Sequence, residues 1–376
     1  MSNALSCLSE LSQRLNRVRR HFAEHIVPLW QGPGWNAELA LPFEALDAQQ
    51  RPEPVKRYRA MACARQLYLF SSRLEQPGAA QRAAALFDSL QRHFHDAQHG
   101  GWFYSIDANG KPLDRRKDLY THAFIAFACA HYWGQVKAPA VAAVLDDVLT
   151  VVTQRFARTD GLYEASLAED WSNLNTGPLQ NPSMHLAEAF LQVLAVRDDS
   201  ATEQALLTLC DALHRHFIEP QHGLMLEKPC GTVDNWFEPG HQFEWFYLLE
   251  TSALLRGTPL HAAIDRAFDF AERHGVERGA VLAMLDVQGR VLDATQRIWA
   301  KAEYLRALVL RPNAQGRLLE QLSALEQLFF HPHGWHECRD ASGAVSRHDM
   351  PSTTPYHLAT ALEGLRRLDS AGTIAH

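Results

Sequence analysis

Hydrophobic side chains recur every three to four positions along most of this chain of 376 residues, and this spacing gives an α-helix one apolar face. Segments rich in Gly, Pro and Asp interrupt the pattern and mark the ends of helices. The pattern predicts twelve helices, at approximately residues 5–28, 54–75, 78–95, 117–134, 138–157, 182–198, 201–218, 241–256, 259–274, 295–311, 313–330 and 354–369.

The predicted helices form six pairs, because short and long connections alternate along the chain. Segments such as 76–78 and 257–258 join the two helices of a pair, whereas about 20 residues lead from one pair to the next, which is long for a helix–helix connection. Long loops on one side and short links on the other predict a closed ring whose working end is formed by the long loops.

A turn that begins with glycine recurs in five of these loops. The leading residues are spaced by 60, 62, 56 and 55 positions, and they are Gly101, Gly161, Gly223, Gly279 and Gly334. Apolar and polar residues alternate around an Asp-x-x-Gly turn in segments 102–110 and 281–289, which is typical of a short antiparallel hairpin. A unit repeated at this length buries its apolar face against its neighbours.

We therefore predict an all-α fold, in which residues 1–376 form a single (α/α)6-barrel domain with short β-hairpins in the long loops at one end. Every second predicted helix would belong to the inner ring. Four of these helices open with His, Tyr, Asn or Glu beside aromatic residues, and they begin near Lys117, Asn181, His241 and Tyr356. Polar groups gathered at one end of a barrel indicate a ligand site.

Composition and charge bear on the partners and the location of the protein. The chain is 47% hydrophobic and 21% charged, with a formal net charge of −7, so it offers no electrostatic reason to bind nucleic acid or an anionic membrane. No segment approaches the roughly 18 apolar residues of a membrane helix, and residues 1–20 lack the pattern of a signal peptide, so we expect a cytoplasmic protein. The six cysteines lack CxxC or zinc-type spacing and are expected to be reduced packing thiols.

Three histidines supply the candidate acid–base chemistry, because an imidazole can accept and donate a proton near neutral pH. His185, His241 and His357 each lie in the first turn or so of an alternate helix, after a Pro or Pro-Gly entry, which places them at one end of the ring. Asn181 lies four residues before His185, and Glu244 lies three residues after His241. Residues at these spacings share a helix face, so both pairs can point into one pocket.

Four further residues fit a pocket for a sugar. Arg65 lies among small and apolar residues, and a buried guanidinium needs a carboxylate or a ligand oxygen. Tyr120, rather than the nearby His122, is the expected pocket member at the start of its helix. Trp299 and Glu303 are four residues apart, and an aromatic plane beside a carboxylate suits a sugar ring and its hydroxyls.

These segments, taken in order, resemble the N-acylglucosamine 2-epimerase superfamily, which includes mannose isomerases, aldose–ketose isomerases and cellobiose 2-epimerases. The likeness extends from Arg65 to His357 and rests on residues 64–71, 117–124, 181–188, 239–245, 297–303 and 355–357. The barrel of that family agrees with the helix count. One departure is that Trp299 to Glu303 lacks the family's Trp-Pro-Gln-like run, which leaves the role of Glu303 open.

The resemblance implies proton abstraction next to a carbonyl, through an enediolate. The implied roles are His357 as base, His241 as ring-opening acid, Arg65 as oxyanion stabiliser, His185 with Asn181 as hydroxyl contacts, Tyr120 and Trp299 as sugar-positioning groups, and Glu244 as the orienter of His241. The expected activity is mannose–fructose isomerisation of a free aldose, with N-acylglucosamine 2-epimerisation as the alternative. Neither a cofactor nor a metal is expected, since His241 and Glu244 lack a third ligand at metal-binding spacing.

Two other classes remain open from the sequence. A glycoside hydrolase on the same barrel would need two carboxylates across the bond, and Glu244 with Glu303 is the obvious pair. The three clustered histidines would then be unexplained. A non-catalytic sugar-binding or protein-interaction module predicts that His357→Ala leaves ligand affinity and function intact. The expected partner is a small-molecule sugar, with neither nucleic acid nor membrane, and the sequence leaves the assembly open between a monomer and a homodimer.

Overall fold

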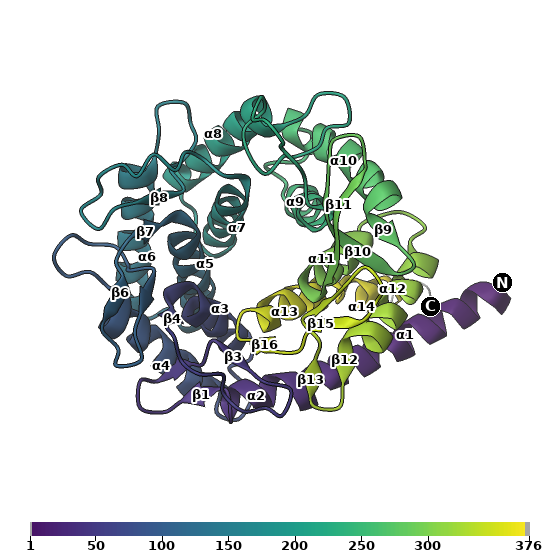
Figure 1. The fold of residues 1–376 in the computed structure, drawn as a ribbon, viewed down its shortest axis with the longest axis horizontal. Coiled ribbons are helices and arrows are strands. Elements are labelled where there is room, and N and C mark those ends of the chain that lie inside the picture. The colour runs from purple at the N-terminus through teal and green to yellow at the C-terminus, as the bar shows by residue number, and fades with distance from the viewer. Residues whose placement is uncertain (1, 373–376) are drawn as a thin grey trace.

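The computed structural model describes residues 2–372, and its helices form two concentric rings (Figure 1). Each helix of the inner ring packs against the next, and the last packs against the first. The inner helices are α3 (Ala60–Ser71), α5 (Leu119–Val136), α7 (Gln180–Val196), α9 (Pro239–Thr251), α11 (Ile298–Leu308) and α13 (Thr354–Gly364). The predicted (α/α)6 barrel is confirmed, with every second helix on the inside.

The outer ring alternates with the inner one along the chain. Its helices are α1 (Ser2–His21), α4 (Ala79–Ser89), α6 (Pro139–Val151), α8 (Ser200–Phe217), α10 (Pro259–Gly275) and α12 (Gln315–Ala324), with the short α2 (Val27–Gln31) after α1 and α14 (Arg367–Gly372) after α13. Four outer helices widen into a π-helical turn at their ends, over Phe22–Ile26, Leu90–Phe94, Val152–Phe156 and Leu325–Phe329. The last side chain of each turn is buried, so the wider turn directs a large apolar group into the core.

Burial explains why the two rings differ in sequence. All twelve residues of α3 are buried, because an inner helix has packed neighbours on nearly every side. In α10, eight of seventeen residues are buried, which is the one-sided pattern of a covering helix. Burial on nearly every side therefore distinguishes the inner helices from the outer ones.

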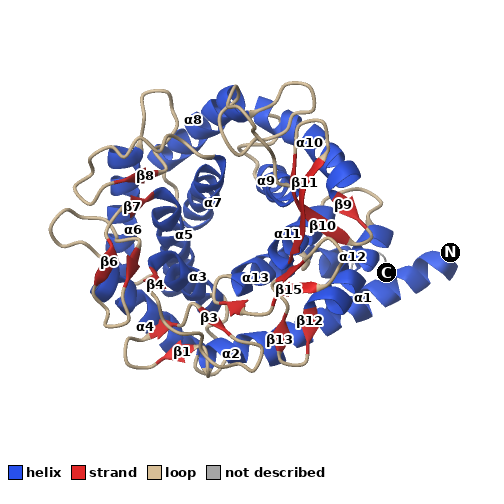
Figure 2. Ribbon diagram, in the orientation of Figure 1, coloured by secondary structure: helices blue, strands red, loops and turns tan. Residues whose placement is uncertain are grey.

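Short strands occupy the loops at one end of the barrel (Figure 2). The paired sets are β1 (Trp35–Asn36) with β2 (Leu41–Pro42); β3 (Ala45–Leu46) with β16 (Met350–Pro351); β4 (Tyr58–Arg59), β5 (Ser105–Ile106) and β6 (Pro112–Asp114); β7 (Lys117–Asp118) with β8 (Ser166–Leu167); and β12 (Phe330–His331) with β13 (Gly334–Trp335). The largest is an antiparallel sheet in the order β15 (Val345–Arg347), β14 (Cys338–Arg339), β11 (Val291–Arg297), β10 (Ala280–Leu285) and β9 (Val276–Glu277).

These strands correct two predicted helix starts. The helix predicted from residue 54 begins at Ala60, because Tyr58 and Arg59 pair with β5 instead. The helix predicted from residue 295 begins at Ile298, because β11 extends to Arg297 and pairs with β14. In both cases a loop strand leads directly into an inner helix and fixes where its first turn lies.

The Asp-x-x-Gly hairpin turn has relatives that its glycine does not reveal. In the turns 107–110, 286–289 and 340–343, the glycine N–H donates to the aspartate carbonyl at 3.1, 2.9 and 2.9 Å. A hydrogen bond between the first and last residues also closes the turns 47–50 and 168–171, where the last residue is Gln50 or Trp171 with φ of 63° and 70°. The sequence pattern missed these two turns because a non-glycine residue takes the left-handed conformation, and because the second begins with Ala168 instead of aspartate.

Two remaining expectations concern thiols and the membrane. Cys63, Cys129, Cys210 and Cys338 are buried free thiols, whereas Cys230 is free but exposed. Within residues 2–372, no helix has both the length and the apolar character needed to cross a bilayer.

Candidate active site

A cavity of about 220 Å³ lies among the first turns of the inner helices. Its lining residues are Arg65, Tyr120, Asn181, His185, Glu238, His241, Glu244, Arg297, Trp299 and His357. Eight of the nine predicted site residues are in this set. Glu303 is not among the lining residues, whereas Glu238 and Arg297 line the cavity without having been predicted.

The barrel brings these residues together because all inner helices start at the same end. His185, His241 and His357 lie near the starts of α7, α9 and α13, so residues more than 170 positions apart surround one space. Each of the three side chains is at most 6% exposed. The cavity therefore holds three imidazoles that are largely shielded from bulk water.

His241 is held by a carboxylate from the preceding loop. Its Nδ1 lies 2.7 Å from Glu227 Oε1, so the expectation that Glu244 orients this ring is wrong. Burial alone would lower the pKa of His241, but the carboxylates of Glu227 and Glu238 outweigh burial and raise it to about 9. His241 is therefore a cation at neutral pH, with Nε2–H left for a ligand.

His357 has the opposite tendency. Its Nδ1 lies 2.8 Å from Glu303 Oε1, which gives Glu303 a place behind the cavity wall as the partner of this ring. Burial, followed by the nearby Arg65 cation, lowers the pKa of His357 well below its usual value. A neutral ring that donates from Nδ1 to Glu303 keeps the lone pair of Nε2 available as a base.

Trp299 packs close to both of these imidazoles. Its ring centroid is 5.1 Å from that of His241 and 5.6 Å from that of His357, with interplanar angles of 35° and 39°. The indole contacts both rings and offers the cavity an aromatic surface. A flat apolar surface beside an acid and a base suits a sugar ring.

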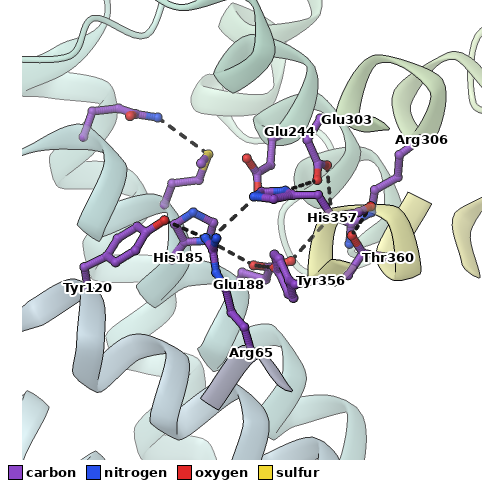
Figure 3. Close-up of polar contacts among 12 residues, drawn as sticks. Arg65, Tyr120, His185, Glu188, Glu244, Glu303, Arg306, Tyr356, His357 and Thr360 are labelled. Atoms are coloured by element: carbon purple, nitrogen blue, oxygen red, sulfur yellow. Dashed lines mark hydrogen bonds and ion pairs between the residues drawn. The ribbon is translucent and has the colours of Figure 1, made fainter. Parts of the chain in front are cut away.

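His185 belongs to a buried network below the cavity (Figure 3). Its Nδ1 lies 3.1 Å from Glu188 Oε2, which also accepts a hydrogen bond from the Tyr356 hydroxyl. Arg306 Nη1 lies 3.5 Å from Glu188 Oε1 and 3.2 Å from Glu303 Oε2. One guanidinium group thus bridges the carboxylate behind His185 and the carboxylate behind His357.

Burial and the Arg306 cation decide which side chains of this network are charged. Burial would raise the pKa of Glu188, but His185 and Arg306 outweigh it and lower that pKa to about 2. Burial lowers the pKa of His185 to about 4, despite the opposing effect of Glu188. Glu188 is therefore an anion and His185 a neutral ring, which places a hydrogen-bonding group rather than a charge beside the ligand.

Arg65 approaches the cavity from α3 across an aromatic wall. Its Nη2 donates to the Tyr120 hydroxyl at 2.6 Å, and its guanidinium carbon lies 4.2 Å from the ring centre of Phe124 and 4.9 Å from that of Tyr356. Over the described part of the chain, Arg65 forms no ion pair with a carboxylate, and its buried Nε makes no hydrogen bond. A buried cation of this kind is suited to an anionic oxygen of a ligand.

Glu244 is a buried carboxyl group with unused oxygens. Neither Oε1 nor Oε2 makes a hydrogen bond with the described residues, and Oε1 lies 3.9 Å from Nδ1 of His185. Burial, followed by repulsion from Glu303 and Glu188, raises the pKa of Glu244 well above its usual value. We conclude that Glu244 is a neutral acid that can donate a hydrogen bond to a ligand oxygen.

His122 differs from these histidines because protein atoms occupy both of its nitrogens. Nδ1 lies 2.7 Å from the Asp118 carbonyl, and Nε2 accepts the Trp102 N–H at 3.1 Å. Burial lowers its pKa to about 4, so the neutral ring joins α5 to the neighbouring loop. Tyr120 rather than His122 lines the cavity, as expected.

Carboxylates and imidazoles also form groups with metal-like spacing. Donor atoms lie within 4.8 Å of one another in the sets His185–Glu188–Glu244, Glu227–Glu238–His241, Glu244–Glu303–His357 and, outside the cavity, Asp96–His99–Glu169. Within the first three sets, each histidine Nδ1 already contacts a carboxylate. A cation bound there would compete with the contacts that orient the imidazoles.

Several residues of this site were missed by sequence reasoning. Glu188 follows His185 by three positions, so the helix-face rule applied to His241 and Glu244 would have found it. Arg306 follows Glu303 by the same spacing. Glu227 lies in a loop 14 positions before His241, and no local spacing rule identifies it.

The barrel and its acid–base cavity define a class of sugar isomerases and epimerases, and comparison with known proteins identifies the family. Residues 42–361 match the family model described as N-acylglucosamine 2-epimerase (GlcNAc 2-epimerase), so the chain belongs to that family.

Two curated relatives and one solved structure illustrate the likeness. A mannose-6-phosphate isomerase of Rhizobium meliloti (strain 1021) is 28% identical over 369 residues, which is 89% of this chain and 92% of the relative. A D-mannose isomerase of Pseudomonas cannabina pv. alisalensis is 33% identical over 198 residues, or 44% of each chain. The structure of a cellobiose 2-epimerase from Bacillus thermoamylovorans B4167 has a TM-score of 0.86 at 17% identity and covers 95% of this chain and 100% of its own.

Proposed function

We propose that this member of the family interconverts an aldose and the corresponding ketose at C1 and C2 of a monosaccharide, with mannose and fructose as the pair. The names of the relatives, mannose-6-phosphate isomerase and D-mannose isomerase, support isomerisation of a sugar of the mannose type. The cavity volume of about 220 Å³ is below the roughly 300–1,000 Å³ of pockets for drug-sized ligands, which suits a single sugar ring.

The observation that carries this proposal is the opposite protonation of His241 and His357, which line one cavity and both pack close to Trp299. One imidazole has a pKa of about 9 and the other a pKa well below its usual value. Two titratable groups whose surroundings push their pKa values apart are the mark of an acid and a base in one site. At neutral pH, His241 is therefore the acid and His357 the base.

The reaction begins with the closed sugar. His241 donates a proton to the ring oxygen and recovers one from the C1 hydroxyl, which opens the ring to the aldehyde. His357 Nε2 then removes the C2 proton, and the electron pair forms a C1=C2 bond while O1 becomes an oxyanion. Arg65, which has no carboxylate partner within the described residues, stabilises that negative charge.

The ketose forms when the proton returns to C1. His241 protonates O1, His357 delivers its proton to C1 on the same face, and the C2 hydroxyl proton passes to His241 as the C2 carbonyl forms. Glu244, His185 and Asn181 hold the remaining hydroxyls. Each histidine ends in its starting protonation state, so the cycle needs no other reactant.

Epimerisation is the alternative outcome of the same enediolate. It requires a proton to reach C2 from the opposite face, and the presence of a second imidazole, His241, in the same cavity lining favours this as a second candidate. N-acylglucosamine would then be the substrate type, as in the name of the family model. Hydrolysis is less well supported, because both oxygens of Glu303 face His357 and Arg306 and Glu303 does not line the cavity.

The test is incubation with mannose, fructose or N-acetylmannosamine in deuterated water, followed by NMR. Loss of the C2 proton signal with formation of ketose is the expected result for mannose. An epimer without ketose would favour the alternative activity. Absence of both exchange and product for all three sugars, from protein whose fold is confirmed by circular dichroism, would reject the proposed reaction.

A further inference from the structure

A second pocket, of about 450 Å³, opens beside the catalytic cavity. Tyr120 and Asn181 line both spaces, so they form the junction between them. The second pocket is otherwise lined by Arg59, Met61, Tyr104, Arg116, Asp118, Leu179, Pro182, Glu227, Lys228 and Trp236. A ligand held in the catalytic cavity can therefore extend past Asn181 into this pocket.

The pocket gathers cations although the whole chain has a net charge of −7. Lys228 lies 4.7 Å from the ring centre of Trp236 and forms no ion pair with any described carboxylate. Arg116 lies 4.1 Å from the ring centre of Tyr104, and its ion pair is a half-exposed contact with Asp114 at 3.5 Å. Such a contact is weak, so two cations are available to a ligand.

Three cations, Arg59, Arg116 and Lys228, line the pocket together with two carboxylates, Asp118 and Glu227. Asp118 caps α5 by accepting the Thr121 N–H, and Glu227 holds His241. Arg59 is paired with Glu44 at 2.7 Å. The lining therefore has one more cation than carboxylates, and Lys228 has no ion-pair partner among the described residues.

Two buried polar atoms in the pocket also lack hydrogen-bond partners among the described residues. They are Asn181 Oδ1 and Trp236 Nε1. Buried polar atoms are normally satisfied, and these two come from separate segments that converge on one space. Their convergence indicates a polar ligand rather than a gap in packing.

We propose that this pocket binds an anionic substituent, of the phosphate ester type, at the end of a sugar whose C1 and C2 lie in the catalytic cavity. This inference rests on the proposed aldose–ketose function and specifies its substrate class as a hexose phosphate. A phosphate oxygen would accept from Lys228 and Arg116, and a hydroxyl near the junction would bind Asn181. A second neutral sugar would use the aromatic rings but leave both cations without an anion.

The first test compares mannose 6-phosphate with mannose as substrates. We expect a higher kcat/KM for the phosphate, and we expect Lys228→Gln or Arg116→Gln to lower the ratio of the two kcat/KM values about 10-fold each, the usual effect of one charge-assisted contact. Lys137→Gln is the matched control. Lys137 also lies over a tryptophan, 3.7 Å from the ring centre of Trp133, but it follows the C-terminal end of α5, whereas Tyr120 of the pocket lies at the N-terminal end. Lys137→Gln should leave the ratio of the two kcat/KM values unchanged.

A binding measurement separates this inference from the proposed reaction. Mannitol 6-phosphate and mannitol cannot be isomerised, and calorimetry gives their affinities for the unmodified protein and for both lysine variants. We expect mannitol 6-phosphate to bind more tightly than mannitol, and we expect Lys228→Gln to lose this preference and Lys137→Gln to keep it. That result would support the anion pocket even if no sugar were converted. Equal affinity for both polyols, a phosphate preference that survives Lys228→Gln and Arg116→Gln, or a better turnover of cellobiose than of either monosaccharide would overturn it.

Discussion

The chemistry of single residues in this cavity is set by their nearest carboxylates. His241 and His357 are both buried imidazoles whose Nδ1 contacts a glutamate. The difference is that Glu227 and Glu238 act together on His241, whereas the cation of Arg65 opposes protonation of His357. Two buried histidines therefore have opposite tendencies to bind a proton: the surroundings of His241 favour the cation, and those of His357 favour the neutral ring.

This difference predicts the pH dependence of the reaction. Activity requires a protonated His241, so kcat/KM should fall as pH rises through about 9. Replacing Glu227 by Gln removes an anion and a charged hydrogen bond of about 1.5–3 kcal/mol, or roughly one to two pH units. We expect the alkaline limb of Glu227→Gln to move to lower pH by that amount, while the acidic limb, which reports His357, stays in place.

The control for this prediction is another histidine–glutamate pair. Glu250 Oε2 lies 2.6 Å from Nε2 of His261, and neither residue lines the cavity. Glu250→Gln should leave the profile of kcat/KM against pH unchanged. An unmoved alkaline limb in Glu227→Gln would show that His241 is not the titrating acid.

At the scale of elements, Arg306 ties three inner helices together. It lies on α11 and contacts Glu303 on the same helix and Glu188 on α7, while His357 of α13 contacts Glu303. Removing one partner of a buried ion pair costs about 3–5 kcal/mol, because the remaining charges are left uncompensated. We expect Arg306→Met to lower the free energy of unfolding in urea by about that amount.

Two comparisons make this prediction specific. Arg306→Lys keeps the charge and should recover part of the loss. Arg215 is on the outer helix α8, where its 52% exposed side chain pairs with Asp211, and Arg215→Met should cost less than about 1 kcal/mol. Similar losses for Arg306→Met and Arg215→Met would mean that the buried network does not stabilise the ring.

A loop glycine shows how closely neighbouring elements pack. An added Cβ at Gly223 would lie 2.3 Å from the carbonyl oxygen of Ala263 in α10, whereas a Cβ at Gly231 would meet nothing within 4 Å. Both residues have positive φ, of 78° and 87°, so both alanine variants lose about 1–2 kcal/mol from backbone strain. Overpacking against Ala263 should lower the stability of Gly223→Ala by roughly a further 1–3 kcal/mol. The measurement is the difference between the urea unfolding free energies of Gly223→Ala and Gly231→Ala.

Local sequence patterns predicted much more of the elements than of the contacts between them. Helical periodicity and loop lengths depend on neighbouring residues, so the inner and outer rings were predicted correctly. The same rule placed Glu244 on the cavity face of α9, but it could not show that Glu227 would reach His241 first. That contact depends on how the loop before α9 folds over the barrel. The π-helical turns were also missed, since they depart from the 3.6-residue period.

At the scale of the whole molecule, a closed ring requires its first and last units to meet. We call this meeting place the seam: α13 packs on α3, β16 pairs with β3, and α1 packs on α12. Arg65 and His357 come from α3 and α13, on the two sides of the seam. The candidate active-site cavity is therefore lined from both sides of the seam, and Figure 1 shows α3 and α13 as neighbours there.

Two kinds of interaction hold α1 at the seam, and their magnitudes decide which matters more. Arg14 and Arg17 contact Glu326 at 2.8 and 3.0 Å, but Arg17 is 46% exposed and such ion pairs contribute about 0–1 kcal/mol. Leu15 is 2% exposed, and truncation of a buried leucine costs about 2–5 kcal/mol. Arg17→Ala removes only the more exposed of the two pairs and should therefore lower the urea unfolding energy by less than about 1 kcal/mol, and Leu15→Ala by several times as much. If Arg17→Ala proved the more damaging change, charge pairing rather than apolar burial would close the ring.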